Sequence, residues 1–271
     1  MTMEQAHDFR DESDALAAVL DGRSNADWMR PTLFKDWTAN DVVRHLHFWN
    51  RGADLALSDP DEFQALRRRF REKAAAVGRG AAEASMVGDL SGPALLDDWR
   101  GFYREMADRW ATVDPRKRVP WVGPDMSARS SITARLMETW SHGQAIFDLF
   151  GLEREEHDRI RNVVFLGINT YGWTWAVRER DAPGPMPHLE LTAPSGAIWE
   201  FGEDDGENRI VGPAVAFAQV VAQTRNVADT DLCVTGPVAA EWMANAQCFA
   251  GPPEPPPPPG ARRAAVDQRH A

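Results

Sequence analysis

The stretch TARLMETWSHGQAIFDLFG, residues 133–151, carries a glutamate and a histidine four positions apart within a helical pattern of apolar residues. Positions i and i+4 of a helix lie one turn apart on the same face, with β-carbons about 5–6 Å apart. Glu138 and His142 can therefore converge on one ion. A contact between the two side chains on a helix surface explains the same spacing, and the spacing alone favours that simpler interpretation. A partner from another helix would decide between them.

The candidate partners lie in VVRHLHFWN, residues 42–50, where His45 and His47 occur among apolar residues. Residues two apart on a helix point in directions about 200° apart, so only one of the two histidines can face the Glu–His pair. His45 shares its helix face with Val42 and Trp49, as a core-facing residue does. We expect His45 to be the third ligand, and a buried, hydrogen-bonded core histidine is the alternative for either residue.

Two histidines and one carboxylate form a three-ligand set. Structural zinc usually takes four protein ligands, whereas three ligands leave a position for water or substrate, as a catalytic metal requires. The ligand types suit zinc, and nickel, manganese and ferrous iron also accept them. The pattern therefore predicts a divalent metal bound by His45, Glu138 and His142, with zinc as the first candidate.

The surrounding sequence, residues 5–180, is helical almost throughout. Thr38 with Asp41 three positions later is typical of a capping box at a helix start, and Asp59-Pro60 separates that helix from the next. Apolar periodicity predicts helices over residues 11–20, 38–57, 60–77, 91–113, 133–151 and 155–180. Long helices joined by shorter loops favour a helical bundle.

The pattern changes after residue 181, and we expect a small α+β domain over residues 182–251. HLELTA and AIWEFG, separated by PSG, predict a hairpin. GPAVAFAQVVAQT predicts a helix, DLCVTG a strand, and PVAAEWMANAQCFAG a last helix with Pro237 in its first turn. The segment PPEPPPPPGARRAAVDQRHA, residues 252–271, cannot bury a core and is predicted to be disordered or polyproline-like.

Charge and composition restrict the function. The formal charge of −11 over 271 residues opposes binding to nucleic acid. No stretch approaches the roughly 20 apolar residues of a membrane helix. Two cysteines, and no apolar segment near residue 1, indicate a reduced, cytoplasmic protein. A small molecule is the expected partner, and any thiol chemistry would need a thiol from outside the chain.

Residues 27–50, DWMRPTLFKDWTANDVVRHLHFWN, resemble the N-terminal helical module of the mycothiol-dependent maleylpyruvate isomerase family, within the wider group of DinB-like metal-binding four-helix bundles. The resemblance rests on Trp28, Pro31-Thr32, Asp36-Trp37-Thr38 and VVRHL, and on ETWSH, which matches the family's Glu-x-x-x-His. It covers residues 5–180 and also places the first ligand on His45. The second domain is similar to α+β modules attached to such bundles, some of them sterol-carrier-like, and the whole fits an actinobacterial subgroup of metal-binding proteins.

This resemblance implies an isomerase or S-transferase in which a metal activates a low-molecular-weight thiol, with mycothiol as the cofactor. The residues leave two alternatives: a metal-dependent reaction without thiol, and a non-catalytic carrier of an apolar ligand. Arg225 and Arg209 are candidates for binding substrate carboxylates, although surface arginines are the more ordinary explanation. Trp49 and Trp140 could wall a pocket, and core packing is the alternative for both.

Overall fold

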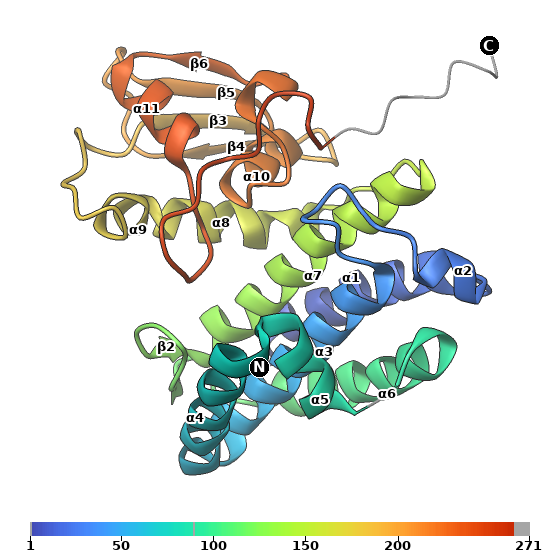
Figure 1. The fold of residues 1–271 in the computed structure, drawn as a ribbon. Helices are drawn as coiled ribbons and strands as arrows, with labels where there is room; N and C mark the ends of the chain where they lie inside the picture. Colours follow the sequence, from blue (N-terminus) through green and yellow to red (C-terminus); the bar gives the residue numbers. More distant parts are fainter. Residues whose placement is uncertain (1, 89, 263–271) are drawn as a thin grey trace, which may run out of the picture. The chain divides into compact units, whose positions relative to one another are not determined.

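The computed structural model describes residues 2–88 and 90–262 (Figure 1). These residues form two compact units, which divide between residues 150 and 151. The first unit is helical, and the second combines helices with a four-stranded sheet. The predicted fold class, a helical bundle followed by a smaller α+β domain, is confirmed. Each unit is described by itself below.

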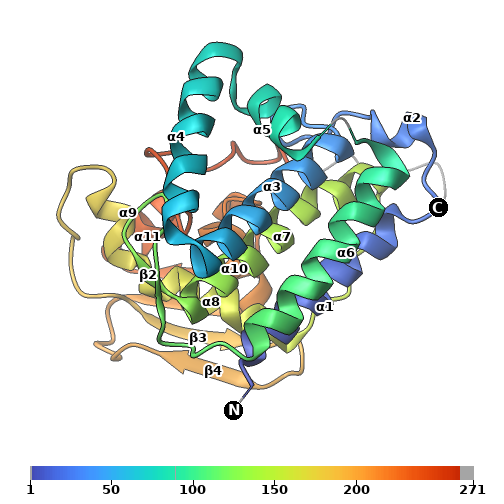
Figure 2. The same ribbon diagram turned by 90° about the horizontal axis from the view of Figure 1, so that it is seen from below.

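Four long helices build the bundle of the first unit. Both α1 and α3 pack against α6 and α7, and Figure 2 shows the four side by side. The helices α4 and α5 pack against α3 and against each other. The bounds of the helices are α1 (Glu4–Leu20), α2 (Asn25–Trp28), α3 (Ala39–Ser58), α4 (Pro60–Val77), α5 (Arg79–Val87), α6 (Gly92–Ala111) and α7 (Ala128–Phe150).

The core of this bundle is aromatic. Its largest fully buried side chains are those of Phe9, Trp28, Phe63, Trp99, Tyr103, Trp110 and Trp140. Large aromatic side chains bury the most apolar area per residue, so a few of them account for much of the driving force for folding. The bundle therefore gives α3 and α7 a rigid, tightly packed setting.

The start of α3 is fixed by the predicted capping box. The Thr38 hydroxyl accepts a hydrogen bond from the backbone N–H of Asp41 at 3.2 Å, and the Asp41 carboxylate accepts one from the backbone N–H of Thr38 at 2.9 Å. A cap of this kind contributes about 1 kcal/mol to stability. The cap fixes the residue at which α3 begins, and therefore the position of His45 along the helix axis.

The second unit contains a sheet with the strand order β4-β3-β5-β6. The hairpin partners β3 and β4 are antiparallel, β3 and β5 are parallel, and β5 and β6 are antiparallel. The elements are η1 (Asp158–Ile160), α8 (Arg161–Asn169), α9 (Tyr171–Ala176), β3 (His188–Thr192), β4 (Ile198–Phe201), β5 (Arg209–Pro213), α10 (Ala214–Val221), η2 (Val227–Asp229), β6 (Cys233–Thr235) and α11 (Pro237–Asn245).

The units divide between Phe150 and Gly151, thirty residues before the boundary expected from the sequence. The reason is the packing of α8, which lies against α10 of the second unit. This approach is close: a β-carbon on Gly167 would lie 2.8 Å from a methyl of Val221. The helix expected over residues 155–180 is also broken, with α8 ending at Asn169 and α9 beginning at Tyr171.

Several further elements differ from the prediction. The structure adds α5, the short β1 (Arg118–Val119) and β2 (Met126–Ser127) hairpin, and β5, which is only five residues long and pairs on both sides. The segment after residue 251 was predicted to be disordered or polyproline-like, and residues 252–262 form defined contacts that argue against the first alternative. There the amide of Gln223 donates to the carbonyl of Glu254, and that of Asn226 donates to the carbonyl of Pro257, both at 2.9 Å. Residues 263–271 lie outside the described residues.

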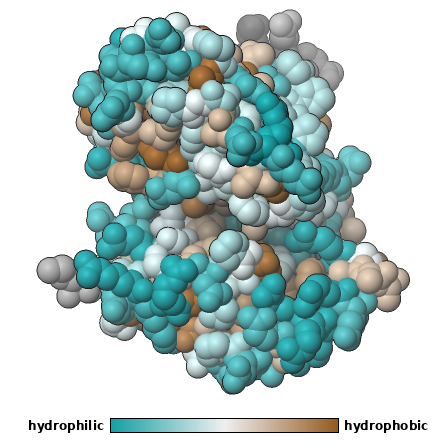
Figure 3. Space-filling model, turned by 90° about the vertical axis from the view of Figure 1, so that its left-hand side faces the viewer, coloured by the Kyte–Doolittle hydropathy of each residue, from teal (hydrophilic) through white to brown (hydrophobic). Residues whose placement is uncertain are grey.

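The helices of residues 2–88 and 90–262 are all too short or too polar to span a bilayer. In the face drawn in Figure 3, hydrophilic residues predominate and apolar residues occur in small groups.

Candidate metal centre

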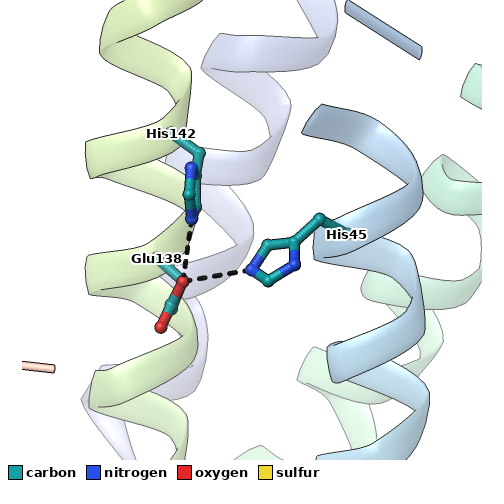
Figure 4. A group of neighbouring side chains, drawn as sticks. All are labelled: His45, Glu138 and His142. Carbon is teal, nitrogen blue, oxygen red and sulfur yellow. Dashed lines mark hydrogen bonds and ion pairs between the residues drawn. The ribbon is translucent and has the colours of Figure 1, made fainter. Parts of the chain in front are cut away.

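Three side chains from two facing helices converge in the first unit (Figure 4). His45 comes from α3, and Glu138 and His142 come from successive turns of α7. The Nε2 atoms of His45 and His142 lie 3.4 Å and 3.1 Å from the same carboxylate oxygen, Oε2 of Glu138. One ligand atom from each residue lies within 4.8 Å of the other two. The structure thus brings together the three residues that the sequence selected.

These separations match those of ligands around a single ion. Zinc binds histidine nitrogens and carboxylate oxygens at about 2.0–2.2 Å, so neighbouring ligand atoms of a tetrahedral site lie roughly 3.3 Å apart. The two nitrogen–oxygen distances fall close to that value on either side. The geometry and the donor types therefore fit a divalent cation.

A second carboxylate, Glu83 of α5, orients His45. Its Oε1 lies 3.1 Å from Nδ1 of His45 and accepts a hydrogen bond from Nε1 of Trp49 at 3.1 Å. Glu83 is only 3% exposed. A carboxylate at the distal nitrogen of a metal-binding histidine selects the tautomer whose other nitrogen is free to coordinate. Sequence reasoning missed Glu83 because it lies 38 residues from His45, on a helix that was not expected.

Aromatic side chains hold the two imidazoles from another side. The ring of Trp37 stacks on His142 with centroids 5.4 Å apart and an interplanar angle of 10°, and its centroid lies 5.2 Å from that of His45. Phe34 contacts His142 edge-on at 5.0 Å. Trp37 precedes the cap residue of α3, so the loop that starts the helix also restricts the rotation of both histidine rings.

The charges of the site favour a cation between the carboxylates. Burial raises the pKa of Glu138, but hydrogen bonds from His142 and His45 and the charge of Arg135 outweigh it and hold this pKa well below its usual value. Burial lowers the pKa of His45, but the hydrogen bonds to Glu138 and Glu83 outweigh it, so the net shift is upward. The raised pKa favours the charged form of His45 in the absence of an ion.

His142 behaves differently from His45. Its burial and the positive charge of His45 outweigh the hydrogen bond to Glu138, so its pKa is lowered. A neutral imidazole is the form that binds a metal. The lowered pKa of His142 thus favours the neutral form that a metal requires, whereas the raised pKa of His45 favours the charged form, from which a bound ion would displace a proton.

His47, the other histidine of α3, lies away from this site. Its Nε2 lies 2.9 Å from Oδ2 of Asp98 on α6, and Arg51 approaches the same oxygen at 3.5 Å. Its imidazole is buried, and its ring lies edge-on to Phe102. The structure thus separates the two histidines as the helical spacing predicted.

The remaining candidates have partners in their own surroundings. Arg209 forms ion pairs with Glu190 at 3.2 Å and Asp204 at 3.5 Å within the second unit. Arg225, 6% exposed, donates to the carbonyl of Thr224. Their role toward a substrate stays a prediction.

The two tryptophans that were candidates for a pocket wall occupy different environments. Trp49 reaches the site through its hydrogen bond to Glu83, and its ring lies 6.5 Å from that of His45. Trp140 is 1% exposed and belongs to the core of the bundle. Trp49 thus lies beside both His45 and its carboxylate partner Glu83.

Fold and site together define a helical bundle with a candidate metal site of two histidines and a glutamate. Residues 9–147, just over half of the chain, match the family model described as the mycothiol maleylpyruvate isomerase N-terminal domain, and the chain belongs to this family. It is 34% identical to uncharacterized proteins of two Mycobacterium tuberculosis strains, CDC 1551 and H37Rv, over 91% of this chain and 95% of theirs.

Solved structures show the same fold. The crystal structure of the mycothiol-dependent maleylpyruvate isomerase aligns with a TM-score of 0.52 at 15% identity, covering 81% of this chain and 88% of the other. A histidine-to-alanine mutant of that enzyme aligns with a TM-score of 0.51 at 14% identity over the same shares. At this level of identity, the likeness concerns the fold.

Proposed function

We propose that this protein is a divalent-metal-dependent enzyme that activates a low-molecular-weight thiol for attack on an electrophilic small molecule. The observation that carries the proposal is the meeting of two histidine nitrogens at one partly buried carboxylate oxygen. Family membership and the name of the structural relatives, which includes mycothiol, support the choice of thiol.

The hydrogen bonding of His45 argues for a cation between its Nε2 and Oε2 of Glu138. When Nδ1 of a neutral His45 donates its hydrogen to Glu83, Nε2 turns a lone pair toward Oε2 of Glu138, which also carries lone pairs. Two facing acceptors repel each other unless a proton or a metal lies between them. Three converging donors of the zinc-binding types favour the metal.

Each residue of the site has a distinct task in this proposal. His45, Glu138 and His142 hold the ion, Glu83 fixes the tautomer of His45, and Trp37 shields the imidazoles from water. A bound divalent cation lowers the pKa of a thiol that ligates it and so supplies a thiolate at neutral pH. Residues 1–150 contain no cysteine, so the bundle itself cannot supply the sulfur.

The reaction class follows from thiolate chemistry. The sulfur forms a bond to an electrophilic carbon of the substrate, and the thiol proton passes to the solvent. In an isomerisation, the carbon–sulfur bond breaks again after rotation about a former double bond, and the thiol is regenerated. In a transfer, a leaving group departs with the electron pair and the thioether is the product. We propose zinc as the metal and mycothiol as the thiol.

Turnover assays test the proposal. Zinc-loaded protein is incubated with maleylpyruvate, as an isomerase substrate, or with monochlorobimane, as an electrophile, each with and without mycothiol. We expect turnover that requires both metal and thiol, that is lost in His45→Ala, and that is retained in His47→Ala. Metal-dependent turnover at the same rate without mycothiol would contradict the role of the thiol and would favour a metal-dependent reaction without it. Full turnover in His45→Ala would contradict the metal half.

A further inference from the structure

Arg135 is a buried cation directly beside the candidate metal centre. It lies on α7, one turn before Glu138, and is 3% exposed. Its Nη2 lies 3.7 Å from Oε1 of Glu138, which is beyond hydrogen-bond range. Its Nε and Nη1 are buried, and neither has a hydrogen-bond partner among the described residues. Arginine is rarely buried without such partners, because the desolvated guanidinium then loses its hydrogen bonds to water.

The surroundings of Arg135 are aromatic. Its Cζ lies 4.9 Å from the centre of the Trp121 ring, and Trp121 contacts the ring of Trp49 with centroids 5.6 Å apart. A ring against the guanidinium uses its face and leaves its N–H donors, which lie in the plane of the group, for other partners. The stacked ring therefore explains why Arg135 is held in place, but it leaves the donors unsatisfied.

Charge compensation of Glu138 does not account for this arrangement. A guanidinium that served only this purpose would form the short paired hydrogen bonds that arginine makes with carboxylates. Here Oε2 of Glu138 faces the two histidines, and Oε1 faces Arg135 without a hydrogen bond. Arg135 thus lies beside the proposed ion position, and its Nε and Nη1 donors have no hydrogen-bond partner among the described residues.

We infer that Arg135 is an anion-binding residue of this site, and that its ligand is a small molecule with a carboxylate that accepts hydrogen bonds from the guanidinium. The inference rests on the proposed function, since a second group of the same ligand would lie at the metal. A planar carboxylate matches the planar donor edge of arginine. It also adds less negative charge beside Glu83 and Glu138 than a phosphate would. Sequence reasoning overlooked Arg135, although it is part of the stretch TARLMETWSH.

Malonate and succinate serve as probes, because their two carboxylates can reach the metal and Arg135 together at two different spacings, whereas acetate can occupy only one position. Binding to the zinc-loaded, full-length protein is measured by calorimetry, and zinc content is measured before and after each titration. The test variant is Arg135→Met, which has no polar group to leave unpaired. The matched control is Arg129→Gln, which removes an exposed arginine from the same helix.

We expect the better of the two dicarboxylates to bind the wild type about tenfold or more tightly than acetate, because the second contact is intramolecular. Arg135→Met should keep one zinc per chain and lose this advantage, and Arg129→Gln should keep it. If Arg135→Met does not fold, Arg135→Lys, which replaces the fork by a single ammonium, should reduce the advantage at unchanged zinc content. An unchanged advantage in the folded Arg135 variant would overturn the inference and leave the metal site intact. A wild type without zinc would overturn the inference together with the proposed function.

Discussion

The two faces of α3 carry two buried histidines with opposite surroundings. His45 faces α7 and α5, where its two nitrogens meet the carboxylates of Glu138 and Glu83 and a second histidine lies close by. His47 faces α6, where a single carboxylate, from Asp98, contacts one nitrogen. A His–carboxylate pair is therefore common to both faces, and the convergence of further ligands is confined to one of them.

This difference separates the histidine that we propose as a metal ligand from one in a structural role. The carboxylate of Asp98 is 39% exposed in its side chain and shares its charge with Arg51, whereas Glu83 is almost fully buried. The pKa of His45 is raised, but that of His47 is lowered, because its burial and the charge of Arg51 outweigh the hydrogen bond to Asp98. The surroundings of His45 thus favour its charged form, and those of His47 favour its neutral form.

The largest effect is expected from removing one of the three proposed metal ligands. Zinc at a thousandfold excess over its dissociation constant should stabilise the wild type by about 4 kcal/mol. His142→Ala should lose nearly all of this stabilisation, because only two ligands remain. Calorimetric melting with and without zinc measures it. His47→Ala is the control, and an equal loss in that variant would abolish the distinction between the two faces.

A smaller effect is expected from changing the carboxylates that contact the two histidines of α3, Glu83 at His45 and Asp98 at His47. Glu83→Gln keeps all three ligands but weakens the orientation of His45, so zinc affinity should fall by about 10–100-fold. Asp98→Asn makes the matching change behind His47 and should leave zinc affinity unchanged. Competition with a chromophoric chelator measures both affinities. Equal zinc affinities for Glu83→Gln and the wild type would show that Glu83 does not support the site.

The smallest effect concerns the pH dependence of stability on the other face. Because the pKa of His47 lies below its ordinary 6.5, the unfolded chain binds this proton more readily than the folded one. The stability that the neutral imidazole contributes is complete above about pH 6.5 and is lost as the pH falls through the lower, folded pKa. The melting temperature of the wild type should therefore fall toward that of His47→Gln between pH 7.5 and pH 5.5, values chosen to bracket roughly this range.

Calorimetry at several pH values measures this difference between the two proteins. His45 is present in both proteins, so its own titration largely cancels. A difference in melting temperature that widens as the pH falls would mean that the folded protein favours the charged form of His47.

Much of this site could be predicted from the sequence because its ligands obey helical geometry. The four-residue spacing of Glu138 and His142 and the opposed directions of His45 and His47 follow from 3.6 residues per turn. Glu83 could not be found this way, since tertiary packing alone brings α5 to α3. Arg135 was within reach, because three residues before Glu138 is the same helix face, but its missing hydrogen-bond partners are visible only in the folded chain.

In the fold, too, some elements could be predicted from local sequence, whereas others depend on tertiary contacts. The capping residues Thr38 and Asp41 and the apolar periodicity located the long helices of the bundle. The strand β5 escaped prediction because its last two residues, Gly212 and Pro213, were assigned to the following helix, and because its pairing with β3 and β6 is tertiary. The ordering of residues 252–262 likewise depends on partners such as Gln223 and Asn226, which no local pattern indicates.

Elemental analysis of the protein, purified without a histidine tag or chelator, tests the central claim most directly. Wild type and His47→Ala should each carry about one divalent metal ion per chain, and His45→Ala should carry almost none, because the remaining ligands bind metal weakly. A metal-free wild type that also takes up no zinc on dialysis would contradict the account, as would His45→Ala with a full complement of metal.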